Sequence, residues 1–355
     1  MTTADRRTRL VAALPDDVDA ILVTKLVNVR YLTGFTGSHG AVLVDREGNA
    51  VLATDGRYRE QAAGEAPDIA IQITRTVATD LVRSASTRRL LRLAIEPHHV
   101  TLSAHESLRA AADEVDLVPV GELVEGLRIR KDDEELRALR SACDITDSAF
   151  TSVLGELRAG RTEREIAWFL MHAMRSAGAE GAAFDSIVAF GPHSAVPHHQ
   201  PTDRVLERGD LVKLDFGARV AGYHADMTRT LVCGPAAEWQ LELHAAVRDV
   251  QERCRSATVV GANPVDLDAM ARQLVGDRGH ALVHGLGHGV GLEIHEQPFL
   301  VPESAADQLA SQVPVTVEPG IYLPDRGGVR IEDTVLVGDA APEALTRSPR
   351  ELVEV

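Results

Sequence analysis

Four carboxylates and one imidazole in the second half of this chain are the side chains best suited to binding metal ions. They lie far apart in the sequence, each in an apolar or glycine-rich stretch: Asp215, Asp226, His288, Glu318 and Glu332. Four negative charges balance two divalent cations, and oxygen-rich ligation with one nitrogen suits hard or borderline ions such as Mn²⁺. The set therefore predicts a two-metal hydrolytic centre, in which the ions activate a bridging water and polarise a scissile carbonyl.

Asp215 and Asp226 lie in two strand-like runs, 211–218 and 223–232, on either side of a predicted turn at 219–222. If the turn is centred on Val220 and Ala221, the two aspartates face each other directly, on one face of the sheet and with Cβ atoms ~5 Å apart. Two like charges that close repel and require neutralisation. For this pair taken alone, a surface hairpin with two solvated aspartates is the alternative.

A glycine-rich stretch at 283–296 holds three histidines: His284, His288 and His295. The glycines argue against a helix and let the backbone approach a site closely. A lone histidine is commonly a core residue. Three in such a loop favour ligand or catalytic roles.

Glu318 and Glu332 each lie in an apolar strand-like run, where an unpaired charge would be costly. In the second run the strand period places Arg330, Glu332 and Thr334 on one face, and sends Asp333 to the other. For Arg330, a structural salt bridge to one of the acids is the alternative and is compatible with a functional role.

The elements that must position these residues lie in the second half of the chain, after a first half that has the pattern of a scaffold. Up to residue ~125, short apolar bursts alternate with amphipathic stretches, which indicates an α/β unit without clustered metal ligands. The acidic run 132–135 then opens a long helical pattern with negative charge in its first turn, and a second helix is predicted over 163–177. We expect two domains, 1–125 and 126–355, as a length of 355 residues favours.

Composition excludes several function classes. With 45% hydrophobic and 25% charged residues, the chain is typical of a globular protein. A formal charge of -16 and no stripe of Lys and Arg argue against a nucleic-acid partner. No apolar run is long enough for a membrane span, and the three cysteines are odd in number without CxxC spacing. We expect a cytoplasmic protein that contacts neither nucleic acid nor membrane.

At these residues the chain resembles the pita-bread metallopeptidases, in particular the Xaa-Pro peptidase branch formed by aminopeptidase P and prolidase. The resemblance covers nearly the whole chain, from 28–35 and 54–58 through to 348–352. It implies an α/β N-terminal creatinase-like domain followed by an α+β pita-bread catalytic domain. It further implies that Asp226 and Glu332 bridge both ions, that Asp215 chelates one, and that His288 and Glu318 bind the other.

The same resemblance implies hydrolysis of the bond between an N-terminal residue and proline in short proline-containing peptides. His198, His295 and Glu318 are then the catalytic residues: His295 steadies the oxyanion and Glu318 passes a proton to the departing proline nitrogen. The residues implied to contact substrate or support the ligands are His284, Tyr322 and Arg330. The implied cofactors are two divalent ions, manganese first, with cobalt, zinc or iron as alternatives, and the implied assembly is a homodimer.

One departure bears on the choice within the branch. Several prolidases carry an arginine soon after the residue matching His295, and the stretch 296–303 has none. This favours an aminopeptidase, with an Xaa-Pro dipeptidase as the alternative. Methionine aminopeptidases usually lack such an N-terminal domain, and creatinase-like hydrolases generally lose the carboxylate set. Two further alternatives are a non-catalytic peptide-binding member and a lyase or amidohydrolase that uses the same metals.

Overall fold

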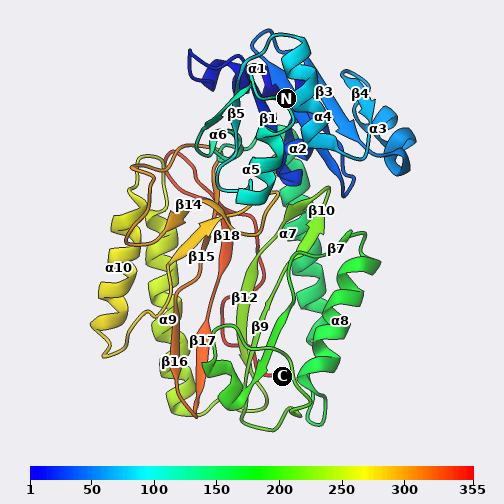
Figure 1. Ribbon diagram of the computed structural model, residues 1–355. Helices are drawn as coiled ribbons and strands as arrows, with labels where there is room; N and C mark the ends of the chain where they lie inside the picture. Colours follow the sequence, from blue (N-terminus) through cyan, green and yellow to red (C-terminus); the bar gives the residue numbers. More distant parts are fainter. The chain divides into compact units, whose positions relative to one another are not determined.

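The computed structural model describes residues 1–355, which form two compact units, Met1–Arg128 and Ile129–Val355 (Figure 1). The first unit is built on a six-stranded sheet in the order β4-β3-β2-β1-β5-β6. Strand β2 pairs antiparallel with β1 and β3, whereas β4, β5 and β6 pair parallel to their neighbours. The elements of this unit are α1 (Thr3–Ala13), β1 (Ala20–Val23), α2 (Leu26–Thr33), β2 (Gly40–Asp45), β3 (Ala50–Thr54), η1 (Gly56–Tyr58), α3 (Arg59–Glu65), β4 (Ala70–Ile73), α4 (Val77–Thr87), β5 (Arg92–Ile95), α5 (Leu102–Arg109), β6 (Asp116–Pro119) and α6 (Leu123–Arg128).

The second unit contains all the candidate site residues. Its elements are α7 (Asp133–Val153), α8 (Glu163–Ser176), β7 (Gly181–Ala182), β8 (Ile187–Phe190), η2 (Gly191–Ala195), β9 (Leu211–Phe216), β10 (Ala218–Val220), β11 (Tyr223–His224), β12 (Met227–Val232), α9 (Glu238–Ala257), α10 (Pro264–Gly276), β13 (Gly287–Gly289), β14 (Glu296–Leu300), β15 (Pro314–Val317), β16 (Gly320–Leu323), β17 (Gly327–Arg330), β18 (Asp333–Leu336) and β19 (Glu343–Ala344). The first unit is thus the mixed α/β unit that the sequence predicted, and the second combines helices with several small, mainly antiparallel sheets, as expected for an α+β domain.

Two helix pairs flank the strands of the second unit. Figure 1 shows α7 and α8 on one side of β9 and β12, and α9 and α10 on the other side of the unit. Phe150 of α7 and Leu170 of α8 belong to one buried cluster with β8, β9 and β12, whereas Val247 of α9 and Ala271 of α10 share a second cluster with β15 and β17. The strands that carry the candidate ligands therefore lie between two hydrophobic cores.

Local sequence explains where the first of these helices begins. Asp132 caps α7, and its carboxylate accepts hydrogen bonds from the backbone N–H groups of Glu134 (2.9 Å) and Glu135 (3.0 Å). Glu135 in turn accepts from the Asp132 N–H at 2.8 Å. This reciprocal cap satisfies donors that the first helical turn leaves free, and the acidic first turn complements the helix dipole.

The hairpin that holds both candidate aspartates differs in register from the prediction. Asp215 pairs with Thr228, not with Asp226. The turn is centred one residue later than expected, on Ala221 (φ 48°) and Gly222 (φ 81°). A two-residue hairpin turn of this type requires positive φ at both central positions, which Gly222 supplies readily and the β-branched Val220 would not. Because the register moves by two residues, Asp215 and Asp226 remain diagonal neighbours on one face.

Two glycines permit close backbone approach beside the candidate ligands. A Cβ added at Gly217 would lie 1.7 Å from the Ala225 carbonyl oxygen, and one added at Gly287 would lie 2.0 Å from that of Thr316. No side chain fits at either position. The backbone beside Asp215, Asp226 and His288 can therefore lie close to the neighbouring strand, because Gly217 and Gly287 have no Cβ.

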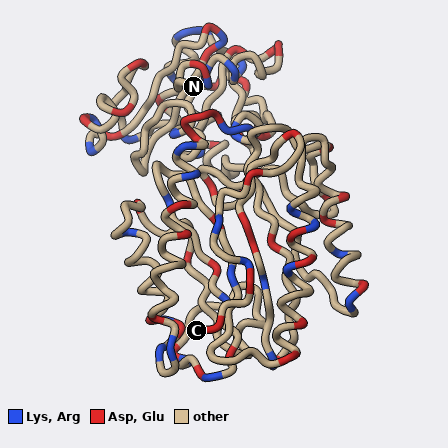
Figure 2. The backbone as a smooth tube through the Cα atoms, turned by 180° about the vertical axis from the view of Figure 1, so that it is seen from behind, with Lys and Arg blue, Asp and Glu red and all other residues tan.

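In Figure 2 the Lys and Arg positions are scattered among the Asp and Glu positions along the backbone. Cys143, Cys233 and Cys254 are buried and unpaired. None of the helices has both the length and the apolar character that crossing a membrane requires.

Candidate active site

The five predicted ligands come from separate elements of the second unit. Asp215 lies on β9, Asp226 just before β12, His288 on β13, Glu318 just after β15, and Glu332 between β17 and β18. The structure brings all five to the lining of one cavity of about 420 Å³. The ligands are distant in sequence but close in space because β9 pairs with β12, and β15 pairs with both β13 and β18.

Asp226, His288 and Glu332 form the tightest group. Their ligand atoms all lie within 4.8 Å of one another, and the three residues are buried. His288 Nε2 is 3.6 Å from Asp226 Oδ2 and 3.4 Å from Glu318 Oε1. The other ring nitrogen, Nδ1, donates to the Gly289 carbonyl at 3.0 Å, which leaves Nε2 directed at the carboxylates.

Three buried carboxylate oxygens in this cluster have no hydrogen-bond partner: Asp215 Oδ1, Asp226 Oδ1 and Glu332 Oε1. The second oxygen of Glu332 accepts from the Thr228 hydroxyl at 2.6 Å, and the second oxygen of Asp215 is paired with Arg330. Leaving buried polar atoms unsatisfied is costly and uncommon in native proteins. One free oxygen on each of three converging carboxylates fits a site for cations.

The pKa shifts agree with that interpretation. Burial, and then the charge of Asp215, raises the pKa of Asp226 well above its usual value, and burial with the charge of Asp226 does the same for Glu332. For His288, burial alone would lower the pKa, but the hydrogen bond with Glu318 and its charge outweigh burial and raise it. The proton that His288 retains in the metal-free protein supplies the positive charge that a bound cation would otherwise provide.

A chain of hydrogen bonds links three of the candidate residues, Arg330, Tyr322 and His284. Arg330 Nη1 donates to the Tyr322 hydroxyl oxygen at 2.8 Å, and that hydroxyl lies 2.9 Å from His284 Nε2. Since His284 Nδ1 donates to the Gly285 carbonyl at 2.8 Å, Nε2 is left to accept from the tyrosine. Burial lowers the pKa of His284, which favours this neutral ring.

The cavity also receives the remaining predicted histidines. His198 and His295 line it, and the rings of His295 and His288 meet edge to face with centroids 4.4 Å apart. His284 and Arg330 line it too, whereas Tyr322 contributes only through them. The lining also includes five apolar side chains, Phe184, Ile187, Ile294, Phe299 and Val301, and the polar side chains of Asp185 and Gln200.

Two supporting threonines were missed in the sequence. Thr228 donates to Glu332 and accepts from Arg330 Nε at 3.1 Å. Thr316 donates to Glu318 Oε1 at 3.2 Å and accepts from the His288 N–H at 3.0 Å. Thr228 lies two residues after Asp226 and Thr316 two residues before Glu318, each acid being next to the end of the threonine's strand, so the strand period that grouped Arg330 with Glu332 would have found both.

Comparisons with known proteins bear on both units. Residues 137–339 match the model of metallopeptidase family M24, and residues 6–130 match the creatinase/prolidase N-terminal domain. The chain is 34% identical to an Xaa-Pro dipeptidase of Pyrococcus furiosus over 98% of this chain and 99% of that protein.

Solved structures give the same picture. An Xaa-Pro dipeptidase from Bacillus anthracis superposes with a TM-score of 0.95 at 36% identity, covering 100% of both chains. An X-Pro aminopeptidase from Thermotoga maritima superposes with a TM-score of 0.90 at 35% identity, covering 99% of this chain and 100% of the other. Proteins named for each of the two reactions are thus similar to this chain along its whole length.

Proposed function

Because the chain belongs to metallopeptidase family M24, we propose that it hydrolyses the peptide bond between an N-terminal residue and a following proline. The observation that carries the proposal is the buried carboxylate cluster with unpartnered oxygens, in a cavity that five apolar side chains also line. The apolar side chains suit contact with a proline ring, and the unpartnered carboxylate oxygens suit binding of cations. Cleavage of Xaa-Pro dipeptides at the same site is the second candidate, favoured by relatives that are named Xaa-Pro dipeptidases.

We propose that Asp226 and Glu332 are shared between two divalent ions, that Asp215 completes one ligand set, and that His288 and Glu318 complete the other. The unpartnered oxygens of Asp215, Asp226 and Glu332 support this assignment. Divalent ions bound there would polarise the scissile carbonyl and lower the pKa of a water molecule. Manganese is the proposed ion, because four carboxylates and one imidazole form an oxygen-rich set.

Glu318 is the proposed carrier of the proton. In the metal-free protein burial alone would raise its pKa, but the hydrogen bond with His288 and the histidine's charge outweigh burial and hold that pKa low, so the carboxylate is ionised there. An ionised carboxylate that lines the cavity can take a proton from the attacking water and deliver it to the proline nitrogen. That delivery matters because the nitrogen of an Xaa-Pro amide carries no hydrogen of its own.

His295 and His198 are proposed to contact the substrate. Burial lowers the pKa of His295, so at neutral pH its ring is uncharged and presents an N–H donor to the cavity. A donor at the developing oxyanion stabilises the transition state more than the substrate. His198, exposed and lining the cavity, is the second donor.

The aminopeptidase reaction is preferred because Arg330 is the one arginine in the cavity lining and its guanidinium is engaged. It bonds to Asp215, to the Tyr322 hydroxyl and to the Pro197 carbonyl. No spare guanidinium lines the cavity to bind the terminal carboxylate of a dipeptide.

The deciding experiment is hydrolysis of Xaa-Pro and Xaa-Pro-Yaa peptides side by side with Mn²⁺, with Xaa-Ala-Yaa peptides and the Glu332→Gln variant as controls. We expect cleavage of the Xaa-Pro-Yaa peptides, release of the N-terminal residue, and little activity in the variant. Cleavage restricted to Xaa-Pro would establish the dipeptidase instead. Binding of the peptides without hydrolysis would establish the non-catalytic alternative.

We also propose a homodimer in the cytoplasm. Three buried, unpaired cysteines support a reducing compartment. The dimer rests on the family resemblance and is tested by sedimentation velocity, in which a single species of monomer mass would contradict it.

A further inference from the structure

Segment 191–202, which follows β8, contributes two side chains, those of His198 and Gln200, to the lining of the cavity. The 3₁₀ helix η2 occupies its beginning, and residues 197–201 lie outside any helix or strand. Regular backbone pairing therefore does not fix the chain around His198. Side chains from other elements must do so.

Glu163, the first residue of α8, holds this segment at both ends. Its fully buried carboxylate accepts on Oε1 from the Phe190 N–H at 2.9 Å and from His193 Nδ1 at 2.8 Å. On Oε2 it accepts from His199 Nε2 at 2.9 Å, and from the N–H and hydroxyl of Thr202 at 2.9 and 2.6 Å. One carboxylate thus bonds Phe190, which precedes the segment, two histidines within it and the threonine at its end.

Two basic side chains, Lys213 and Arg330, hold the same segment by hydrogen bonds to its carbonyl groups. Lys213 Nζ donates to the carbonyl oxygens of Val196 at 2.6 Å and Pro197 at 3.2 Å. Arg330 Nη1 also donates to Pro197 O at 3.2 Å. His198 therefore stands between Pro197, whose carbonyl accepts from two basic side chains, and His199, which Glu163 holds.

Glu163, His193 and His199 also have the composition of a metal site. Both carboxylate oxygens already receive backbone or hydroxyl hydrogen bonds, which an ion would have to displace. Burial alone would raise the pKa of Glu163, but the hydrogen bonds from Thr202, His199 and the backbone outweigh it and hold the pKa below its usual value. An ionised carboxylate with its oxygens satisfied is suited to fixing a chain.

We propose that Glu163 is a positioning residue that acts through His193, His199 and Thr202 to hold segment 191–202 so that His198 faces the substrate. The effect on catalysis rests on the proposed function, since it requires His198 to contact the substrate. The effect on the segment itself does not.

The first test is amide hydrogen exchange in Glu163→Gln. Glutamine keeps the size of the side chain but replaces one acceptor oxygen with an NH₂ group that cannot accept. We expect the amides of 190–202 to exchange about 10-fold faster than in the wild type. Glu165→Gln is the matched control on the same helix, because Glu165 is exposed and a capping box tolerates glutamine. It should leave exchange in the segment unchanged.

The second test is a double-mutant cycle on peptide hydrolysis with Mn²⁺ bound. Glu163→Gln should lower kcat/KM by about 10- to 10²-fold with metal content intact, because a misplaced contact residue costs that much. The double variant with His198→Ala should be no worse than His198→Ala alone, since Glu163 then has nothing left to position. Glutamine at His199 keeps a donor near the Nε2 position, so His199→Gln should retain far more activity than His199→Ala.

Wild-type exchange in Glu163→Gln, or a double variant whose loss equals the product of the single losses, would overturn the proposal. So would a divalent ion that is lost in Glu163→Gln and kept in Glu332→Gln. If Glu163→Gln does not fold, the His199 pair carries the same comparison. Faster exchange in a protein without Xaa-Pro hydrolysis would refute the proposed function alone and leave the positioning role in place.

Discussion

Asp226 illustrates how a residue suited to binding a cation weakens the protein when the cation is absent. Its carboxyl group is buried near Asp215 and Glu332, and its Oδ1 has no partner. Burial and repulsion raise its pKa, so ionising it in the metal-free protein costs free energy. Asparagine has the same shape and no charge.

We therefore expect Asp226→Asn to stabilise the metal-free protein at neutral pH by more than about 1 kcal/mol. A group whose folded pKa is raised contributes stability that is fully present below its unfolded pKa, near 4, and is lost as pH rises through the folded pKa. The gain of the variant over the wild type should accordingly grow from about pH 4 upward. Urea unfolding in chelator measures it, and a gain that does not change with pH would contradict the raised pKa of Asp226.

The two neighbouring histidines are expected to differ in function. His288 Nε2 faces Asp226 and Glu318, whereas His295 lies outside that group and lines the cavity. His288→Ala should weaken metal binding. His295→Ala should keep the ions and lower kcat by ~10²- to 10³-fold, as the loss of an oxyanion donor does.

Metal stoichiometry and kcat, measured for both histidine variants at one Mn²⁺ concentration, decide between the two roles. Loss of an ion from His295→Ala would reverse the assignment. Full metal affinity in His288→Ala would do the same.

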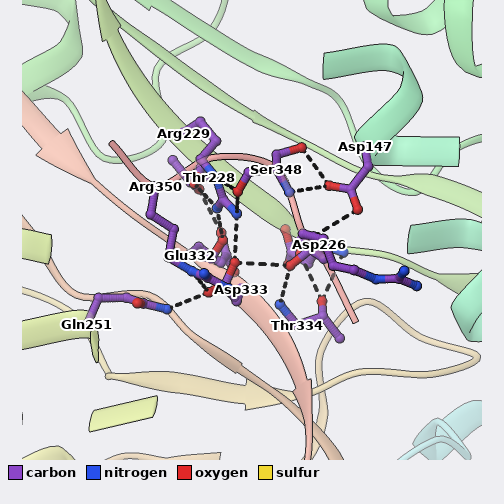
Figure 3. Close-up of polar contacts among 12 residues, drawn as sticks. Asp147, Asp226, Thr228, Arg229, Gln251, Glu332, Asp333, Thr334, Ser348 and Arg350 are labelled. Carbon is purple, nitrogen blue, oxygen red and sulfur yellow. Dashed lines mark hydrogen bonds and ion pairs between the residues drawn. The ribbon is translucent and has the colours of Figure 1, made fainter. Parts of the chain in front are cut away.

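At the scale of elements, strand alternation separates two adjacent acids. Figure 3 shows Glu332 beside Thr228, while Asp333 contacts Arg229, Gln251 and Arg350. Asp333 is fully buried among these partners, so it is a structural ion-pair residue away from the cavity. Of these two adjacent residues, Glu332 thus belongs to the candidate site and Asp333 to the ion pairs of the core.

Glu332→Gln should abolish most activity and weaken metal binding with little loss of stability. Asp333→Asn should instead lower the free energy of unfolding by about 3 kcal/mol, because it leaves buried cations without their counter-charge. Its activity per folded molecule should stay close to that of the wild type. Denaturant unfolding and initial rates at 20 °C, measured on both variants, test the contrast, and equal losses of activity would contradict the assigned faces.

Period-two reasoning anticipated part of this arrangement. It placed Arg330 with Glu332 and Asp333 opposite, and the contacts of all three agree. It put Asp215 and Asp226 on one face but in the wrong register, because the turn was assigned without the positive φ that Ala221 and Gly222 adopt.

The meeting of distant elements was beyond such reasoning. The approach of His288 to Glu318 and the hold of Glu163 on Thr202 depend on how separate strands and helices pack. No local period of the sequence encodes that packing. Residue types grouped the four acids with His288, and the resemblance to a known family assigned the individual role of each.

For the whole molecule, bound ions add positive charge to a chain with a net charge of -16. Ligands that bind only the folded state stabilise it, by about 2.7 kcal/mol per site at a free concentration 100 times Kd. Saturating Mn²⁺ should therefore raise Tm by about 5 °C or more over the chelated protein. Scanning calorimetry measures the shift, Glu332→Gln should lose most of it, and an unchanged wild-type Tm would contradict a metal site in the core.

The three buried cysteines of the second unit can report how fast the elements around them open. Burial raises the pKa of the Cys143, Cys233 and Cys254 thiols, so the reactive thiolate is scarce while the fold is closed. Alkylating reagents should modify the protein only when α7, the end of β12 or α9 opens. The growth of singly, doubly and triply labelled masses would then time these openings in the natural chain, with no engineered probe.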